Sequence, residues 1–146
     1  MGTVYEVKCR DESCGFQSKV FAGMSMLDYM LSSSAEERIL KGEEEAPEDV
    51  VEQLKAGEHM TCGETYLCPK CREWKTSDAM LVAQVTEVDA DGEVLDCVPH
   101  YLTGEPPKCD VCGTEMVYIP DPCAPVTKCP RCGLDHMIIS AEMMFD

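Results

Sequence analysis

Alternating apolar and polar positions predict β-strands in the first and last parts of the chain. Phe16, Ser18 and Val20 fall on one face of residues 16–21, and the residues between them fall on the other. Residues 3–8 alternate more loosely, so residues 3–21 are predicted to form a β-hairpin interrupted by a turn. Further strands are predicted at residues 79–88, 93–95, 115–119 and 136–145, the first two joined by an Asp91-Gly92 turn.

The pattern changes to a helical one between these strands. Ser25 stands three residues before Asp28, and Ser34 stands three residues before Glu37, which is the spacing of a capping box. A helical insertion is therefore predicted over about residues 25–57. Its apolar positions are Met26, Leu27, Met30 and Leu31 in a first helix, Ile39 and Leu40 in a second, and Val50, Val51 and Leu54 in a third that begins at Pro47.

Composition shows that the apolar core is small for a chain of 146 residues. The hydrophobic fraction is 45%, but it includes 11 Cys and 10 Met, with only three Phe, one Trp and five Tyr. Cores of this kind usually need disulfides or metal ions. The sequence shows no secretory signal and no apolar run long enough to span a membrane, so we expect a cytoplasmic protein with reduced thiols that bind metal.

Eight of the eleven cysteines form four close pairs. The pairs are Cys9/Cys14, Cys68/Cys71, Cys109/Cys112 and Cys129/Cys132. Sixteen residues separate the third pair from the fourth, as expected of a zinc site built from two Cys-x-x-Cys turns. The last two pairs are therefore predicted to share one ion.

The first two pairs are predicted to share a second ion. They are separated by 53 residues, and the helical insertion would account for this length if its ends lie close together. This pairing divides the chain into an N-terminal unit of residues 1–102 and a C-terminal unit of residues 103–146.

The Cys-Pro-Arg-Cys-Gly segment at residues 129–133 resembles a rubredoxin-type knuckle, and the four pairs together resemble the zinc-ribbon superfamily. The chain is also similar to small acidic two-ribbon bacterial proteins with a helical insertion in the first ribbon. This resemblance implies an α+β fold of two small antiparallel β zinc ribbons, the first with the insertion. Four thiolates at each site would leave no open coordination position for a reactive water, so we expect two structural zinc ions and no enzymatic activity.

Iron is the alternative metal, and it would make the protein a rubredoxin-like electron carrier. Rubredoxins are acidic and hold one iron between paired knuckles, but they form single compact domains with an aromatic-rich core. This chain has a single Trp and a shorter spacing between its last two knuckles, which favours zinc.

Three cysteines remain outside the four pairs. His59, Cys62, Cys97 and His100 have ligand spacing and are a candidate third site, against the alternative that Cys62 and Cys97 are buried core thiols. Cys123 has no His or Lys beside it in the sequence, so we interpret it as a loop thiol. Most methionines are expected to fill the core, although methionine also suits adaptable binding surfaces.

The net charge of −16 bears on the partner. A four-thiolate zinc site adds about −2, and proteins that grip nucleic acid need basic surfaces to neutralise phosphates. We therefore expect a cytosolic adaptor or accessory subunit that binds a protein partner, through the insertion with its acidic linker at residues 43–45 or through the tip at residues 120–125. A zinc-ribbon transcription or nucleic-acid-associated regulator is the remaining alternative.

Overall fold

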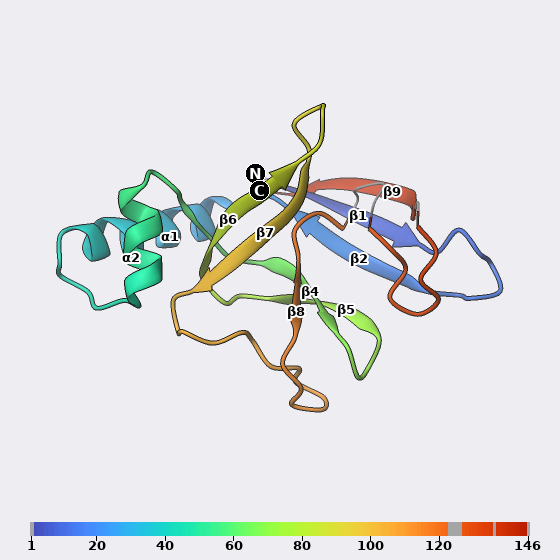
Figure 1. The fold of residues 1–146 in the computed structure, drawn as a ribbon. Coiled ribbons are helices and arrows are strands. Elements are labelled where there is room, and N and C mark those ends of the chain that lie inside the picture. The colour runs from blue at the N-terminus through green and yellow to red at the C-terminus, as the bar shows by residue number, and fades with distance from the viewer. Residues whose placement is uncertain (1, 123–126, 136, 146) are drawn as a thin grey trace.

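The computed structural model describes residues 2–122, 127–135 and 137–145, which form two helices and three antiparallel sheets of three strands (Figure 1). The first sheet has the order β2-β1-β9, the second β3-β6-β7 and the third β5-β4-β8. The strands are β1 (Gly2–Lys8), β2 (Gln17–Ala22), β3 (Met60–Thr61), β4 (Glu64–Cys68), β5 (Glu73–Ser77), β6 (Leu81–Val88), β7 (Val94–Tyr101), β8 (Val117–Ile119) and β9 (Ile138–Phe145).

Strand pairing crosses the boundary expected between residues 102 and 103. β9 pairs with β1, so the two ends of the chain lie together (Figure 1), and β8 pairs with β4. The predicted units 1–102 and 103–146 therefore do not form separate sheets. Each early hairpin, β1–β2 or β4–β5, gains its third strand from the last part of the chain. A two-stranded hairpin is only marginally stable. The third strand forms hydrogen bonds with one open edge of the hairpin and so stabilises it.

The helical insertion contains two helices, α1 (Met26–Leu40) and α2 (Glu48–Lys55). Ser25 caps α1, because its hydroxyl accepts a hydrogen bond from the Asp28 N–H at 3.1 Å. The second predicted helix start, at Ser34, is wrong. Ser34 lies inside α1, and its hydroxyl accepts a hydrogen bond from the Arg38 guanidinium one turn later at 2.6 Å instead of capping a new helix.

The apolar residues in the first half of α1 face away from the core. Ser32, Ala35 and Ile39 are buried on one stripe, and the position one turn before Ser32 on this stripe is the polar Asp28. The helix is therefore oriented by its second half, which leaves its first apolar residues exposed. The expectation that most methionines fill the core is wrong for Met26, Met30, Met143 and Met144, which are 58–69% exposed.

Three clusters of buried side chains make up the core. One joins the helices to β3 and β6, through Ala35, Ile39, Val50, Leu54, Met60 and Val82. The other two surround cysteines. Val7, Phe16, Val20 and Trp74 pack around Cys9 and Cys129, while Tyr66, Leu81, Tyr101 and Met116 pack around Cys68 and Cys109. The core is thus divided into small parts, which is consistent with the shortage of large apolar residues.

Truncating Leu54 to alanine tests the packing of α2. Leu54 is 4% exposed in the helical cluster, so Leu54→Ala is expected to lower the free energy of unfolding by about 2–4 kcal/mol. Leu40 is 48% exposed, so the matched variant Leu40→Ala should cost under about 1 kcal/mol. Urea unfolding of both variants measures the difference, and equal losses would contradict this placement of α2.

In the part of the chain that the structure describes, neither helix has the length and hydrophobicity needed to cross a membrane.

Candidate metal centres

The eight paired cysteines meet in two groups of four, and in each group the sulfur atoms all lie within 4.8 Å of one another. The outer cluster joins Cys9 and Cys14 to Cys129 and Cys132. The inner cluster joins Cys68 and Cys71 to Cys109 and Cys112. The predicted pairing, in which each pair joins the next one along the chain, is therefore wrong. The first pair meets the last, and the two middle pairs meet each other.

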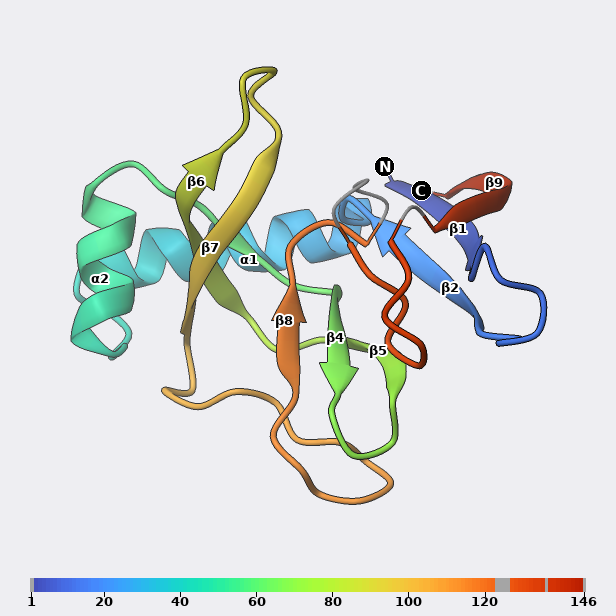
Figure 2. The same ribbon diagram turned by 45° about the vertical axis from the view of Figure 1, so that its right-hand side comes forward.

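Strand pairing explains this nested order. The first knuckle, a tight turn that carries two cysteines, joins β1 to β2, and the last knuckle leads into β9, which pairs with β1. The second knuckle joins β4 to β5, and the third leads towards β8, which pairs with β4. In Figure 2 the turn between β4 and β5 and the loop before β8 lie at the same end of the sheet. Each sheet thus brings two knuckles together at one end.

The sulfur–sulfur distances fit a tetrahedral metal site. In the outer cluster Cys9 lies 3.4 Å from Cys132, and Cys14 lies 3.7 Å from Cys129. In the inner cluster Cys68 lies 3.5 Å from Cys112, and Cys71 lies 3.9 Å from Cys109. A tetrahedron with metal–sulfur bonds of about 2.3 Å has edges of about 3.8 Å. A disulfide would need about 2.05 Å, so the two clusters have the spacing of metal ligands.

Backbone N–H groups in the knuckles point at the sulfur atoms. The Asp11 N–H donates to the Cys9 sulfur at 3.4 Å, and the Cys71 N–H donates to the Cys68 sulfur at 3.3 Å. The N–H of Thr114 makes the same kind of contact with Cys112, and that of Leu134 with Cys132. These hydrogen bonds favour thiolates and hold their orientation, which is how proteins support metal-bound cysteines.

Hydrogen bonds and burial give the thiols of the two clusters different proton affinities. The Thr114 hydroxyl, and after it the Thr114 N–H, lower the pKa of Cys112 to about 6. Hydrogen bonds to Cys112 and Cys68 raise the pKa of Cys71 to about 12, and burial raises that of Cys9 to about 12. Four adjacent thiols do not all ionise without a cation, because their negative charges repel one another. A divalent ion would replace these protons and relieve the repulsion.

The residue after each knuckle adopts a positive φ angle. Gly15, Gly113 and Gly133 do so at 73°, 73° and 79°, as their sequence positions predict. At the equivalent position after Cys71 the chain has Arg72 with φ 55°, the only described non-glycine residue with a positive φ. A side chain in this region costs roughly 1–2 kcal/mol, so Arg72 holds a strained backbone.

Replacing Arg72 with glycine is expected to stabilise the protein. The variant Arg72→Gly removes the strain of the left-handed backbone, but it also raises the conformational entropy of the unfolded chain. The net gain in the free energy of unfolding is expected to be about 0.5–1 kcal/mol. The control Lys70→Gly lies in the same turn without a positive φ and should bring no gain. Urea unfolding of the metal-loaded variants measures both effects. A lower free energy of unfolding in Arg72→Gly would contradict the inference that the Arg72 backbone is strained.

Contacts between side chains link the two clusters. Trp74 follows the second knuckle and packs on Phe16, which lies beside the outer cluster, with ring centroids 5.3 Å apart in an edge-to-face arrangement. Arg131 from the last knuckle lies over the Phe16 ring at 5.5 Å and forms an ion pair with Glu73 of β5. The sheets that carry the two clusters are therefore packed together.

The residues of the predicted third site do not assemble. His59 contacts Glu36 at 3.2 Å, and His100 contacts Asp49 and Gln84 at 2.8 Å and 2.9 Å. Cys62 and Cys97 belong to neither group of potential metal ligands among the described residues. Cys62 is buried and Cys97 is half-buried, and burial raises the pKa of both thiols, to about 11 for Cys97. Cys123 lies outside the described residues.

Knuckle spacing contained no signal for the observed pairing. Cys9 and Cys132 are 123 positions apart, and only the pairing of β1 with β9 brings them together. Comparisons with known proteins found no matching family model, curated protein or solved structure. The two centres are therefore assigned from their own geometry.

Proposed function

We propose that the protein is a small zinc-binding adaptor or accessory subunit that acts through contacts with another protein. Two four-cysteine clusters would each hold one structural zinc ion at the end of a three-stranded zinc ribbon. Four thiolates complete the tetrahedral coordination of zinc and leave no position for a reactive water. This closed ligand set supports a structural metal and a protein that is not an enzyme.

The metal is tested by elemental analysis of protein purified without added metal. We expect two zinc ions per chain and no visible colour. Two tightly held ferric ions with the red colour of an iron–thiolate centre would contradict the proposal and favour the electron-carrier alternative.

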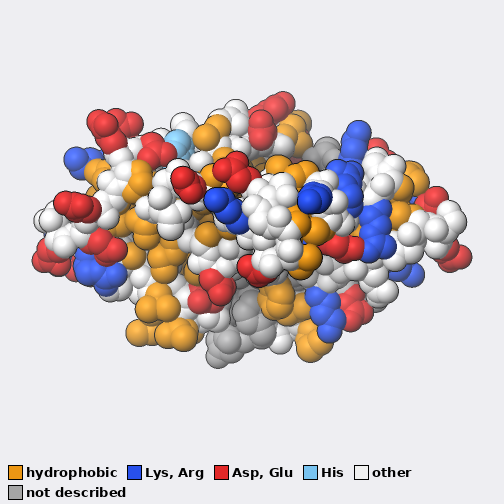
Figure 3. Space-filling model, turned by 90° about the horizontal axis from the view of Figure 1, so that it is seen from below, with side chains coloured by type: hydrophobic (Ala, Val, Ile, Leu, Met, Phe, Trp, Pro, Cys, Tyr) orange, Lys and Arg blue, Asp and Glu red, His pale blue; other side chains and the backbone are white. Residues whose placement is uncertain are grey.

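The observation that supports a protein partner is the exposed apolar surface of α1. We define the α1 surface as Met26, Leu27, Met30 and Leu31, which are 50–66% exposed. Seen from below, hydrophobic side chains gather at the helical end of the molecule (Figure 3). Contiguous apolar residues of this kind mark interaction sites, and methionine adapts its shape to a partner. The α1 surface is therefore the proposed contact region.

Charge indicates the chemistry of the partner. The chain has a net charge of −16, and Glu43 and Glu45 are exposed just beyond the end of α1. The negative electrostatic field of these charges repels nucleic acid and attracts basic protein surfaces. We propose a partner protein with an apolar patch flanked by Lys and Arg.

Affinity capture with matched variants tests this surface. Leu27→Lys with Met30→Lys should abolish capture of the partner while zinc content and stability stay unchanged. The control Val88→Lys replaces a residue that is 52% exposed on β6 and should bind as the parent does. Capture that persists in the double variant, or a stable dimer of this chain that covers the α1 surface, would contradict the proposal.

A further inference from the structure

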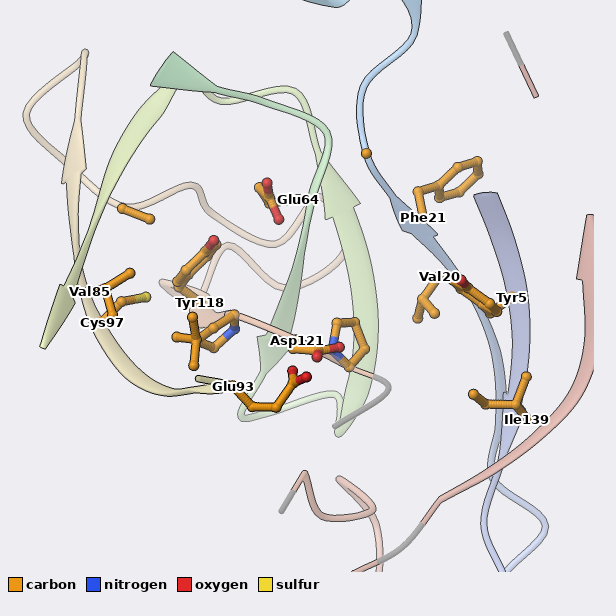
Figure 4. A pocket seen from close by; sticks show the side chains of 15 residues that line it. Tyr5, Val20, Phe21, Glu64, Val85, Glu93, Cys97, Tyr118, Asp121 and Ile139 are labelled. Carbon is orange, nitrogen blue, oxygen red and sulfur yellow. The ribbon is translucent and has the colours of Figure 1, made fainter. Parts of the chain in front are cut away.

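A cavity of about 560 Å³ lies where the three sheets meet (Figure 4). Tyr5 and Val20 of the first sheet form one side, and Val85 and Cys97 of the β6–β7 hairpin form the other. Glu64 and Tyr118, from β4 and β8, lie between these walls (Figure 4). The volume falls in the range of about 300–1,000 Å³ that is typical of small-ligand sites.

The charged residues that line the cavity, among those the structure describes, are all acidic. They are Glu64, Glu93 and Asp121, and no described Lys, Arg or His joins them in the lining. Carboxylates along a hollow with low-dielectric walls create a field that attracts cations and repels anions. An anionic ligand is therefore excluded.

Glu64 is half-buried and has neutral partners. Its carboxylate accepts a hydrogen bond from the Thr61 hydroxyl at 2.7 Å and another from the Tyr118 hydroxyl. Burial raises the pKa of Glu64, and this effect is larger than the opposing effect of the two hydrogen bonds. Because no cation of the described chain forms an ion pair with Glu64, a cationic ligand would supply the missing charge.

Aromatic and aliphatic side chains complete the walls. Tyr5 and Tyr118 contribute rings, and Val85 and Ile139 contribute aliphatic surface. Burial keeps the Tyr118 hydroxyl protonated by raising its pKa, so Tyr118 remains a neutral ring beside Glu64. Aromatic faces attract ammonium and guanidinium groups, and aliphatic walls bind an apolar stem.

We propose that this cavity binds an organic cation, namely an ammonium or guanidinium group carried on an apolar stem. The carboxylates that line the cavity supply the negative field for the positive charge, and the rings and aliphatic side chains contact the stem. Both a free amine and the Lys or Arg side chain of another protein present this chemistry. The site is separate from the two cysteine clusters and does not depend on the metal they hold.

Titration of the metal-loaded, ¹⁵N-labelled protein tests the proposal by NMR. The probes are agmatine as a free amine and N-acetyl-arginine amide as a protein-like side chain, with N-acetyl-citrulline amide as the neutral analogue of the latter. We expect saturable shifts at the cavity residues with the cations and none with citrulline. Tighter binding of agmatine would assign the site to a free amine, and tighter binding of the capped arginine would assign it to a protein side chain.

Variants separate this site from non-specific attraction to an acidic protein. Glu64→Gln and Glu93→Gln are each expected to weaken binding about tenfold, because a charge-assisted contact is lost. The control Glu105→Gln changes an exposed carboxylate outside the cavity lining and should have no effect. Val85→Phe fills the cavity from a half-exposed position and should block binding. Equal binding of citrulline, equal affinity in all variants, or no saturable binding of either cation would overturn the proposal.

Discussion

Removal of the bound metal with a chelator is expected to unfold both cysteine-centred sheets. A structural zinc ion contributes about 10–16 kcal/mol of apparent binding free energy in small domains, while a whole domain is stable by only about 5–15 kcal/mol. Two of the three core clusters contain cysteines, and their remaining apolar side chains are few. Without the ions, the adjacent thiols must be protonated or must separate. The small apolar clusters do not supply enough stability to hold the knuckles together.

The loss of structure can be followed by near-ultraviolet circular dichroism and by the dispersion of the amide NMR spectrum. Stoichiometric zinc should restore both signals, and the same amount of magnesium, which prefers oxygen ligands, should restore neither. A spectrum that keeps its full dispersion after elemental analysis shows complete metal removal would contradict a structural role for the ions.

Double cysteine variants are expected to distinguish the nested pairing from pairing between neighbours in the sequence. Cys14→Ser with Cys129→Ser removes two ligands from the outer cluster and leaves the inner cluster complete. This variant should therefore keep one zinc ion per chain. Cys14→Ser with Cys71→Ser removes one ligand from each cluster, so both ions should be held weakly and should be lost to a competing chelator.

The second double variant is the matched control for the first, because both remove two thiols and share the change at Cys14. Pairing between neighbours in the sequence predicts the opposite result, with one ion retained when Cys14 and Cys71 are replaced. Zinc content is measured by elemental analysis after equilibration with the chelator. If only the variant with Cys14 and Cys71 replaced retained a zinc ion, the nested arrangement would be wrong.

The nested order of the two cysteine clusters bears on the order in which the sheets form. The outer cluster joins the first knuckle to the last, so the β2-β1-β9 sheet is complete only after residues 129–145 have been made. The inner cluster joins cysteines no more than 44 positions apart and needs only the middle of the chain. Contacts between distant residues form more slowly than local ones. We therefore expect the β5-β4-β8 sheet to form before the β2-β1-β9 sheet.

Local features of the sequence were sufficient to predict the knuckles and part of the secondary structure, although they predicted no strand at β3, β4 or β5. Cys-x-x-Cys turns depend on a few neighbouring residues, and the glycines after three knuckles have the positive φ that their position predicts. The cap at Ser25 and the α2 helix also follow from nearby residues. These features are local because hydrogen bonds over three or four residues determine them.

The partner of each knuckle and the exposed side of α1 were decided only in the tertiary structure. All four knuckles present similar pairs of thiols, so spacing alone does not show which pairs share an ion. The pairing of β9 with β1 and of β8 with β4 makes that choice. In the same way, the packing of Ala35 and Ile39 orients α1 and turns Met26 and Met30 outward. Both outcomes depend on contacts between residues far apart in the chain, which composition and periodicity do not encode.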